Sequence, residues 1–116
     1  MKLLKEFLHK CEIKQLKALK KKFTNQLLQH NTFVMGTMQR RYHFCRKIGC
    51  KCMDKKNPQP HGPYNYLAYR GSAKPGMLVL DLKQYKQAHQ MIKNYHTLWE
   101  LFCSISSINI ELLRRR

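Results

Sequence analysis

The chain has 116 residues, of which 23 are Lys or Arg and 6 are Asp or Glu, so its formal net charge at pH 7 is +17. Such an excess of positive charge indicates a polyanionic partner. The hydrophobic fraction of 43% excludes a disordered basic tail, because segments that stay unfolded lack the apolar surface that offsets chain entropy. The length favours one domain over residues 1–116. Its modest hydrophobic core would gain stability from a bound metal.

The start of the chain shows no sign of export. Charged residues interrupt every apolar pair in MKLLKEFLHK, so the apolar run of a secretory signal is missing. No stretch approaches the roughly 20 apolar residues that span a bilayer, and no membrane is expected as a partner. The five cysteines are therefore expected to be thiols or metal ligands in a reducing compartment. The protein is predicted to be cytoplasmic.

The first predicted element is a long N-terminal helix over residues 1–30. Apolar residues from Leu4 to Leu27 recur at spacings near those of a helical turn, which is typical of an amphipathic helix. The opposite side carries a row of lysines, namely Lys10, Lys14, Lys17 and Lys21. This row has two interpretations, the solvated face of the helix or a set of contacts to the phosphates of a nucleic acid.

Residues 32–80 are predicted to hold a three-stranded antiparallel sheet with a zinc-bound turn. The first strand covers residues 32–44, which are rich in β-branched and aromatic residues and include Gly36, an indication of a bulge or a close backbone approach. Residues 61–70 alternate with the period of two expected of a second strand. A turn over residues 71–76 then leads to a third strand at residues 77–80, so that these two strands form a hairpin.

A long C-terminal helix is predicted over residues 82–115. Asp81 and Gln84 resemble a capping box at its start. Its apolar seam is spaced alternately by four and three residues and consists of Met91, Tyr95, Leu98, Phe102, Ile105, Asn109 and Leu112. Such a heptad seam packs against another helix. The partner is either the N-terminal helix, in a helical hairpin, or a second chain, in a dimeric coiled coil. The predicted fold class is α+β.

Three cysteines and a histidine in the middle of the chain supply a complete ligand set for Zn²⁺. They are Cys45, Cys50, Cys52 and His61. A closed Cys₃His set indicates structural zinc, because catalytic zinc usually keeps one position open for water or substrate. The fourth position has alternatives, since His43 or Asp54 could replace His61. Gly49, just before the paired cysteines, allows the tight backbone that two nearly adjacent ligands need.

The cysteines also have other interpretations. The spacing Cys-x4-Cys-x-Cys differs from the two-residue spacing of most zinc modules, and ordinary free thiols are the alternative. Cations such as those of Arg46 and Lys51 would favour a reactive thiolate. Cysteine catalysis also needs an orienting group and an oxyanion site, for which the sequence has no recognisable pattern. The acidic residues are dispersed, unlike the carboxylates of a metal-dependent nuclease, so a non-enzymatic protein is predicted.

Basic and aromatic residues are interleaved around the predicted zinc turn. Basic side chains contact phosphates, and aromatic faces stack on unpaired bases. RNA or single strands are slightly favoured over duplex DNA, because neither long helix resembles a recognition helix. For any single tyrosine, packing in the core is the alternative. Beside the lysine row, the predicted contacts are Arg40, Arg41, Arg46, Lys47, Lys51, Tyr64 and Arg70.

The chain resembles a family of small bacterial and archaeal proteins known only as a domain of unknown function. The resemblance is carried by Cys45, Gly49-Cys50-Lys51-Cys52, His61-Gly62-Pro63-Tyr64 with Tyr66-Leu67, the pattern of the last helix, and Gly36-Thr37 with Arg40. This chain has Arg46-Lys47-Ile48-Gly49 where such proteins carry Gly-Lys-Pro-Gly. The family often occurs near mobile genetic elements, so the resemblance implies a prokaryotic or phage origin and a link to nucleic-acid transactions, without an assigned activity.

The sequence therefore predicts a non-enzymatic, zinc-stabilised protein that binds RNA or DNA. The expected setting is a ribonucleoprotein or mobile-element complex, in which the chain would be an accessory subunit with a protein partner. The chain is also predicted to form a homodimer. The alternative is a helical module for protein interaction or oligomerisation, and a DNA-binding regulator or an enzyme is favoured less.

Overall fold

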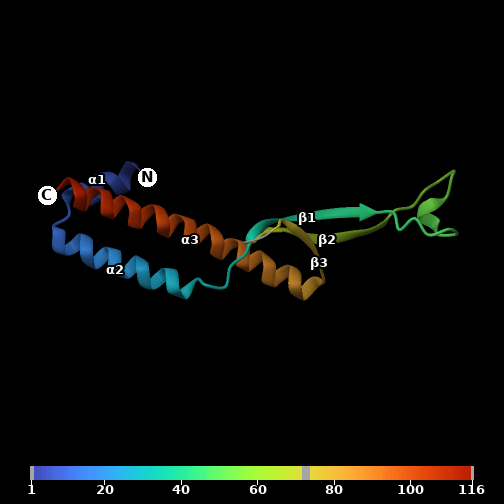
Figure 1. Ribbon diagram of the computed structural model, residues 1–116, viewed down its shortest axis with the longest axis horizontal. Coiled ribbons are helices and arrows are strands. Elements are labelled where there is room, and N and C mark those ends of the chain that lie inside the picture. The colour runs from blue at the N-terminus through green and yellow to red at the C-terminus, as the bar shows by residue number, and fades with distance from the viewer. Residues whose placement is uncertain (1, 72–73, 116) are drawn as a thin grey trace. The chain divides into compact units, whose positions relative to one another are not determined.

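The structure is a computed structural model and describes residues 2–71 and 74–115. The described residues form α1 (Lys2–Lys10), α2 (Ile13–Gln29), β1 (Met35–His43), a 3₁₀ turn η1 (Lys51–Met53), β2 (His61–Arg70), β3 (Gly76–Leu80) and α3 (Leu82–Arg114) (Figure 1). Three α-helices and a three-stranded antiparallel sheet in the described part confirm the α+β fold class. None of the described helices is both long enough and apolar enough to cross a bilayer.

The chain divides into two compact units. The helical unit comprises residues 1–33 and 93–116, and the sheet unit comprises residues 34–92. Helix α3 contributes its first part to the sheet unit and its second part to the helical unit.

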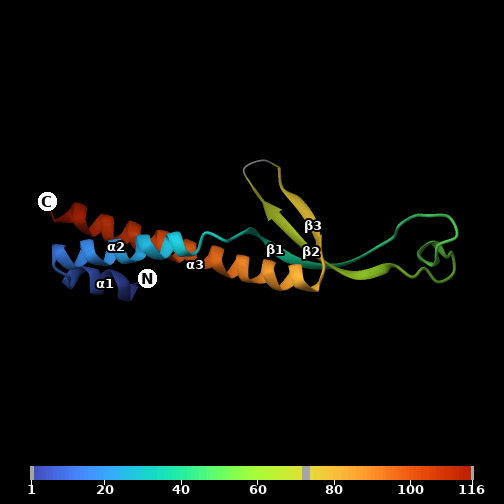
Figure 2. The same cartoon turned by 90° about the horizontal axis from the view of Figure 1, so that it is seen from below.

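The core of the helical unit is formed by one fully buried side chain from each helix. Leu8 of α1, Leu16 of α2 and Ile108 of α3 are at most 1% exposed and contact one another. Figures 1 and 2 show that α2 and the second part of α3 run side by side in opposite directions. Around this centre pack the partly buried Leu4, Cys11, Leu19, Phe23 and Leu112. The second part of α3 thus buries an apolar face within its own chain.

The predicted N-terminal helix over residues 1–30 is two helices in the structure. The chain leaves helical geometry at Glu12, whose backbone is extended with φ −73° and ψ 157°. Glu12 caps α2 in a reciprocal capping box, in which its own N–H donates to the Gln15 Oε1 at 2.9 Å. The cap satisfies N–H groups that have no partner within the helix. The predicted lysine row is divided as a result, with Lys10 on α1 and Lys14, Lys17 and Lys21 on α2.

The buried face of α3 agrees with the predicted seam at Leu98, which is 6% exposed, and differs from it at Phe102. Phe102, a predicted seam residue, is 55% exposed, whereas Leu101 and Ile108 are 7% and 0% exposed. The predicted seam residue Asn109 is half-buried. An α-helix has about 3.6 residues per turn, so a strict heptad pattern drifts around a straight helix. The assignment of Phe102 to the packed face was therefore wrong.

Arg115, directly after α3, links the end of that helix to α1. The Arg115 Nε donates to the Glu111 Oε1 at 3.0 Å, and the Glu111 side chain is only 6% exposed. The Arg115 guanidinium also donates to the backbone carbonyls of Leu8, His9 and Cys11. Carbonyl groups at the end of a helix lack intrahelical partners, so Arg115 satisfies the carbonyl end of α1.

Glu111 makes the stability of the helical unit depend on pH. Burial raises the pKa of this carboxyl group, but Arg115 and then His9 outweigh burial and hold the pKa below 4.5. A carboxyl group with a lowered folded-state pKa contributes stability above its unfolded value and loses it as pH falls through the folded value. The melting temperature should therefore fall as the pH is lowered from neutral to about pH 3. Glu111→Gln should make this fall smaller, because the variant lacks the carboxyl group that titrates. The exposed Glu100→Gln is the control, and equal pH profiles for both variants would contradict the assignment.

The sheet unit has the strand order β1-β2-β3, and all pairs are antiparallel. The first part of α3 covers one face, where Ala88 packs on Leu67 of β2 and Leu80 of β3 (Figure 2). A Cβ on Gly36 would lie 2.5 Å from the carbonyl oxygen of Ala68, which confirms the close backbone approach predicted at this glycine. The predicted turn over residues 71–76 includes residues 72–73, which lie outside the described residues.

The other face of the sheet is here called the outer sheet face. Directly paired residues of antiparallel strands point to the same side, and the register pairs Arg41 with Tyr64 and Tyr66 with Val79. Met77 pairs with Ala68, two residues further along β2, and joins the same face. Tyr64, Met77 and Val79 are 39%, 45% and 51% exposed. The outer sheet face therefore presents aromatic and apolar side chains to solvent, with Arg41 beside them.

Candidate metal centre

The pairing of β1 with β2 brings both ends of the ligand segment together. His43 pairs with His61 after an irregularity in register between Arg41 and His43. The chain leaves β1 and returns to β2 at this point, and residues 44–60 form the connection, here called the ligand loop. Within the loop, the short turn η1 carries Cys52, and Cys50 precedes it with extended backbone.

Two positive φ angles shape the ligand loop. Gly49 has φ 87°, which confirms the tight backbone predicted before Cys50, and Arg46 has φ 60°. The left-handed region is costly for residues with a Cβ, so the turn at Arg46 uses a backbone conformation that such residues rarely adopt. The Cys50 N–H donates to the Lys47 carbonyl at 3.1 Å, and the Met53 N–H donates to the Cys50 carbonyl at 3.0 Å.

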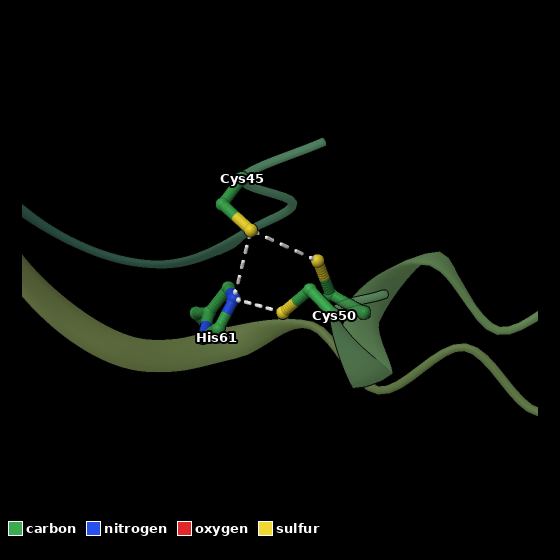
Figure 3. A group of neighbouring side chains, drawn as sticks. Cys45, Cys50 and His61 are labelled. Carbon is green, nitrogen blue, oxygen red and sulfur yellow. Dashed lines mark hydrogen bonds between the residues drawn. The ribbon is translucent and has the colours of Figure 1, made fainter. Parts of the chain in front are cut away.

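The four predicted ligand atoms converge. The Sγ atoms of Cys45, Cys50 and Cys52 and one ring nitrogen of His61 lie within 4.8 Å of one another. The Cys45 Sγ is 3.4 Å from the Cys52 Sγ, and the His61 Nε2 is 3.1 Å from the Cys50 Sγ and 3.3 Å from the Cys45 Sγ (Figure 3). A tetrahedral zinc with Zn–S bonds of about 2.3 Å separates its sulfur ligands by about 3.8 Å. The donor set and its spacing therefore fit a metal ion held by four protein ligands.

The alternatives to His61 make other contacts. The ring of His43 packs against the rings of His61 and Tyr64, with centroid distances of 5.5 and 5.1 Å. The Asp54 carboxylate accepts a hydrogen bond from the backbone N–H of Lys56 at 3.1 Å. Within residues 2–71 and 74–115, the group that could hold a metal contains His61 and neither alternative.

The thiols of the group differ in acidity. Burial opposes ionisation of Cys52, but hydrogen bonds from the Cys45 side chain and from the Cys45 and Arg46 backbone outweigh it and lower the pKa to about 6. The backbone N–H of Lys47 favours the Cys45 thiolate, yet contacts with Cys52 and Cys50 and burial raise the pKa of Cys45 above 9.0. Metals bind the thiolate form, which the hydrogen bonds to Cys52 favour.

The predicted nucleic-acid contacts fall into separate groups. Arg41 and Tyr64 are paired on the outer sheet face, and Arg70 joins that face through its pairing with Met35. Arg40 pairs with Asn65, so it lies on the opposite side of β1. The ligand loop carries the exposed Arg46, Lys47 and Lys51. The lysine row of α1 and α2 belongs to the helical unit.

Met77 and Val79 are residues that the sequence analysis did not single out. Both belong to the outer sheet face, whereas Leu80 on the same strand is 8% exposed. Alternation along β3 could have separated the two sets of residues. It could not have indicated which set α3 covers, because that depends on tertiary packing.

Fold and site together define an α+β protein with a Cys₃His group on the connection between its first two strands. Residues 11–77 match the family described as Domain of unknown function (DUF6788). The match covers more than half of the chain, so the protein belongs to this family. The matched segment ends before α3 begins. Comparison with curated proteins and with solved structures returns no match.

Proposed function

We propose that this protein is a non-enzymatic, zinc-stabilised nucleic-acid-binding protein that prefers single strands or RNA. Its proposed setting is a ribonucleoprotein or mobile-element complex, in which it would act as an accessory subunit. The cation would be zinc, held by Cys45, Cys50, Cys52 and His61, because three thiolates and an imidazole are a ligand set typical of structural zinc. Four protein ligands fill a tetrahedral shell, which supports a structural role for the ion.

The observation that carries the proposal is the Arg41–Tyr64 pair on the outer sheet face. Both side chains are exposed, and the ring of Tyr64 packs on one side against His43. Tyr66 follows on the same face of β2. Aromatic rings with an adjacent guanidinium can stack on unpaired bases while the cation contacts the phosphate. Paired bases keep their faces covered, so this surface supports single strands over duplexes.

The charge of the ligand loop supports the same ligand class. Residues 44–60 contain five Lys or Arg and one Asp, a density that attracts a polyanion over several ångströms. Arg46, Lys47 and Lys51 are exposed and lie within two residues of a proposed metal ligand. A metal that holds the loop would therefore also hold these cations in place.

A titration of fluorescently labelled single-stranded oligonucleotide tests the proposal. Tyr64→Leu should weaken binding by about 5- to 150-fold, because one stacked base contributes about 1 to 3 kcal/mol. With about five phosphates contacted, log affinity should fall against log salt with a slope of about −3.5. Arg41→Gln should make that slope shallower by about 0.7.

Arg40→Gln is the matched control, since Arg40 is the exposed neighbour of Arg41 on the opposite side of β1. It should change affinity less than Arg41→Gln. Absence of binding at low salt would overturn the proposal. If Tyr64→Leu lowered the affinity for a duplex as much as the affinity for a single strand, the preference for unpaired bases would be contradicted.

A further inference from the structure

Four large apolar side chains of α3 are exposed within the helical unit. Trp99, Phe102, Ile110 and Leu113 are 60%, 55%, 50% and 61% exposed. At about 100° per residue, they fall with the exposed Ser106 inside an arc of about 80°. The buried Leu101 and Ile108 lie on the opposite side of the helix. These five residues, from Trp99 to Leu113, are here called the exposed stripe.

The spacing of the exposed stripe is symmetric about Ser106. Phe102 and Ile110 lie four residues before and after it, and Trp99 and Leu113 lie seven residues before and after it. A two-fold axis through two antiparallel helices places each residue before the centre opposite the equivalent residue after it. The stripe is thus self-complementary, with Trp99 facing Leu113 and Phe102 facing Ile110. The small Ser106 lies at the axis, where the helices would come closest.

The charge pattern favours a second copy of the chain on this surface. Residues 94–113 contain no Lys or Arg and two Glu, although the chain carries 23 Lys or Arg. A chain with net charge +17 is repelled by its own copies wherever cations face each other. The exposed stripe is therefore a surface on which two copies can meet, whereas a polyanion would find no cation there.

The flank of the stripe supports an antiparallel arrangement. Glu100 and Arg114 are both exposed and lie on the same flank of α3. Inside the chain, Glu111 is paired with Arg115 at 3.0 Å and more loosely with Arg114 at 3.7 Å. Antiparallel pairing keeps this flank on the same side of both copies and brings Glu100 of one copy near Arg114 of the other, whereas parallel pairing places the two flanks on opposite sides of the interface.

We infer that the exposed stripe is an antiparallel, two-fold interface with a second copy of this chain. The inference does not rest on the proposed nucleic-acid binding. The stripe extends over about 21 Å of helix, and burial of its side chains removes roughly 400 to 600 Å² from water on each copy. That is less than the about 800 Å² per partner of a standard interface. The dimer should therefore dissociate at micromolar concentrations.

Trp99 is the single tryptophan of the chain and reports on the stripe directly. Nucleic-acid-free, zinc-loaded protein should be followed by sedimentation velocity and by tryptophan emission from about 1 to about 200 µM. The expected result is a rise in mass from monomer to dimer, with a blue shift of emission over the same range. Salt should strengthen the dimer, because it screens the repulsion between the copies. The effect of salt on the dimer is therefore opposite to its effect on nucleic-acid binding, which salt should weaken.

Ser106→Lys is the decisive variant, since it places two cations at the two-fold axis but alters only an exposed position of the monomer. It should raise the dissociation constant at least about tenfold. Asn25→Lys is the matched control, because it adds the same charge at an exposed position of α2 and should leave most of the dimer intact. A monomer at every concentration and salt, or equal effects of the two variants, would overturn the inference.

Discussion

Purified, reduced protein should contain close to one zinc ion per chain, and removal of the zinc should unfold the ligand loop. The large apolar side chains of the loop contribute little, since Phe44, Ile48 and Met53 are 49%, 105% and 46% exposed. The deeply buried residue in the loop is Cys52, at 1%, and its neighbours are the other ligands. Structural zinc binds small peptides with about 10 to 16 kcal/mol at pH 7, so the metal would be the main source of order here.

Metal analysis and amide hydrogen exchange measure the two parts of this expectation. The backbone N–H groups of Cys50 and Met53, which are hydrogen-bonded within the loop, should exchange slowly with zinc and rapidly after chelation. Cys52→Ala should lose the metal, and the half-buried Cys103→Ala of the helical unit should keep it. Metal-free fresh protein whose loop amides remain protected would contradict the assignment.

Leu16→Ala should destabilise the helical unit by about 2 to 5 kcal/mol, the usual cost of removing a buried leucine side chain. Leu16 is 0% exposed and contacts the other two fully buried core residues, Leu8 and Ile108. The loss combines the transfer of apolar surface to water with the cavity that remains. In so small a domain, this is a large part of the total free energy of unfolding.

Leu28→Ala is the matched control on the same helix, because Leu28 is 72% exposed. It should change the free energy of unfolding by less than about 0.5 kcal/mol. Urea denaturation followed by far-ultraviolet circular dichroism measures both variants. Similar losses for the two would show that the core does not lie where Leu8, Leu16 and Ile108 meet.

Local patterns in the sequence were sufficient to predict the three strands and the grouping of Cys45, Cys50, Cys52 and His61. The period of two in residues 61–70 matches β2, and the cysteine segment could be assigned because all four ligands lie within 17 residues. His43 and His61, the residues on either side of the ligand loop, pair with each other and bring the two ends of the loop together. Short-range chemistry of this kind needs no knowledge of the tertiary packing.

The boundaries and the buried faces of the helices depend on tertiary contacts, which cannot be read from the sequence. Glu12 is an uncommon capping residue, since Ser, Thr, Asp and Asn are preferred, so the break between α1 and α2 was missed. In α3, apolar residues occupy both the buried face and the exposed stripe. Periodicity alone could not tell which of Leu101 and Phe102 would be buried.

The most direct test of the central claim compares the affinity of the protein for a single-stranded oligonucleotide before and after zinc removal, at one low salt concentration. If the metal at Cys45, Cys50, Cys52 and His61 holds a nucleic-acid-binding surface in place, removal of zinc should weaken binding at least about tenfold, and added zinc should restore it. An affinity that is the same with and without zinc would contradict the account.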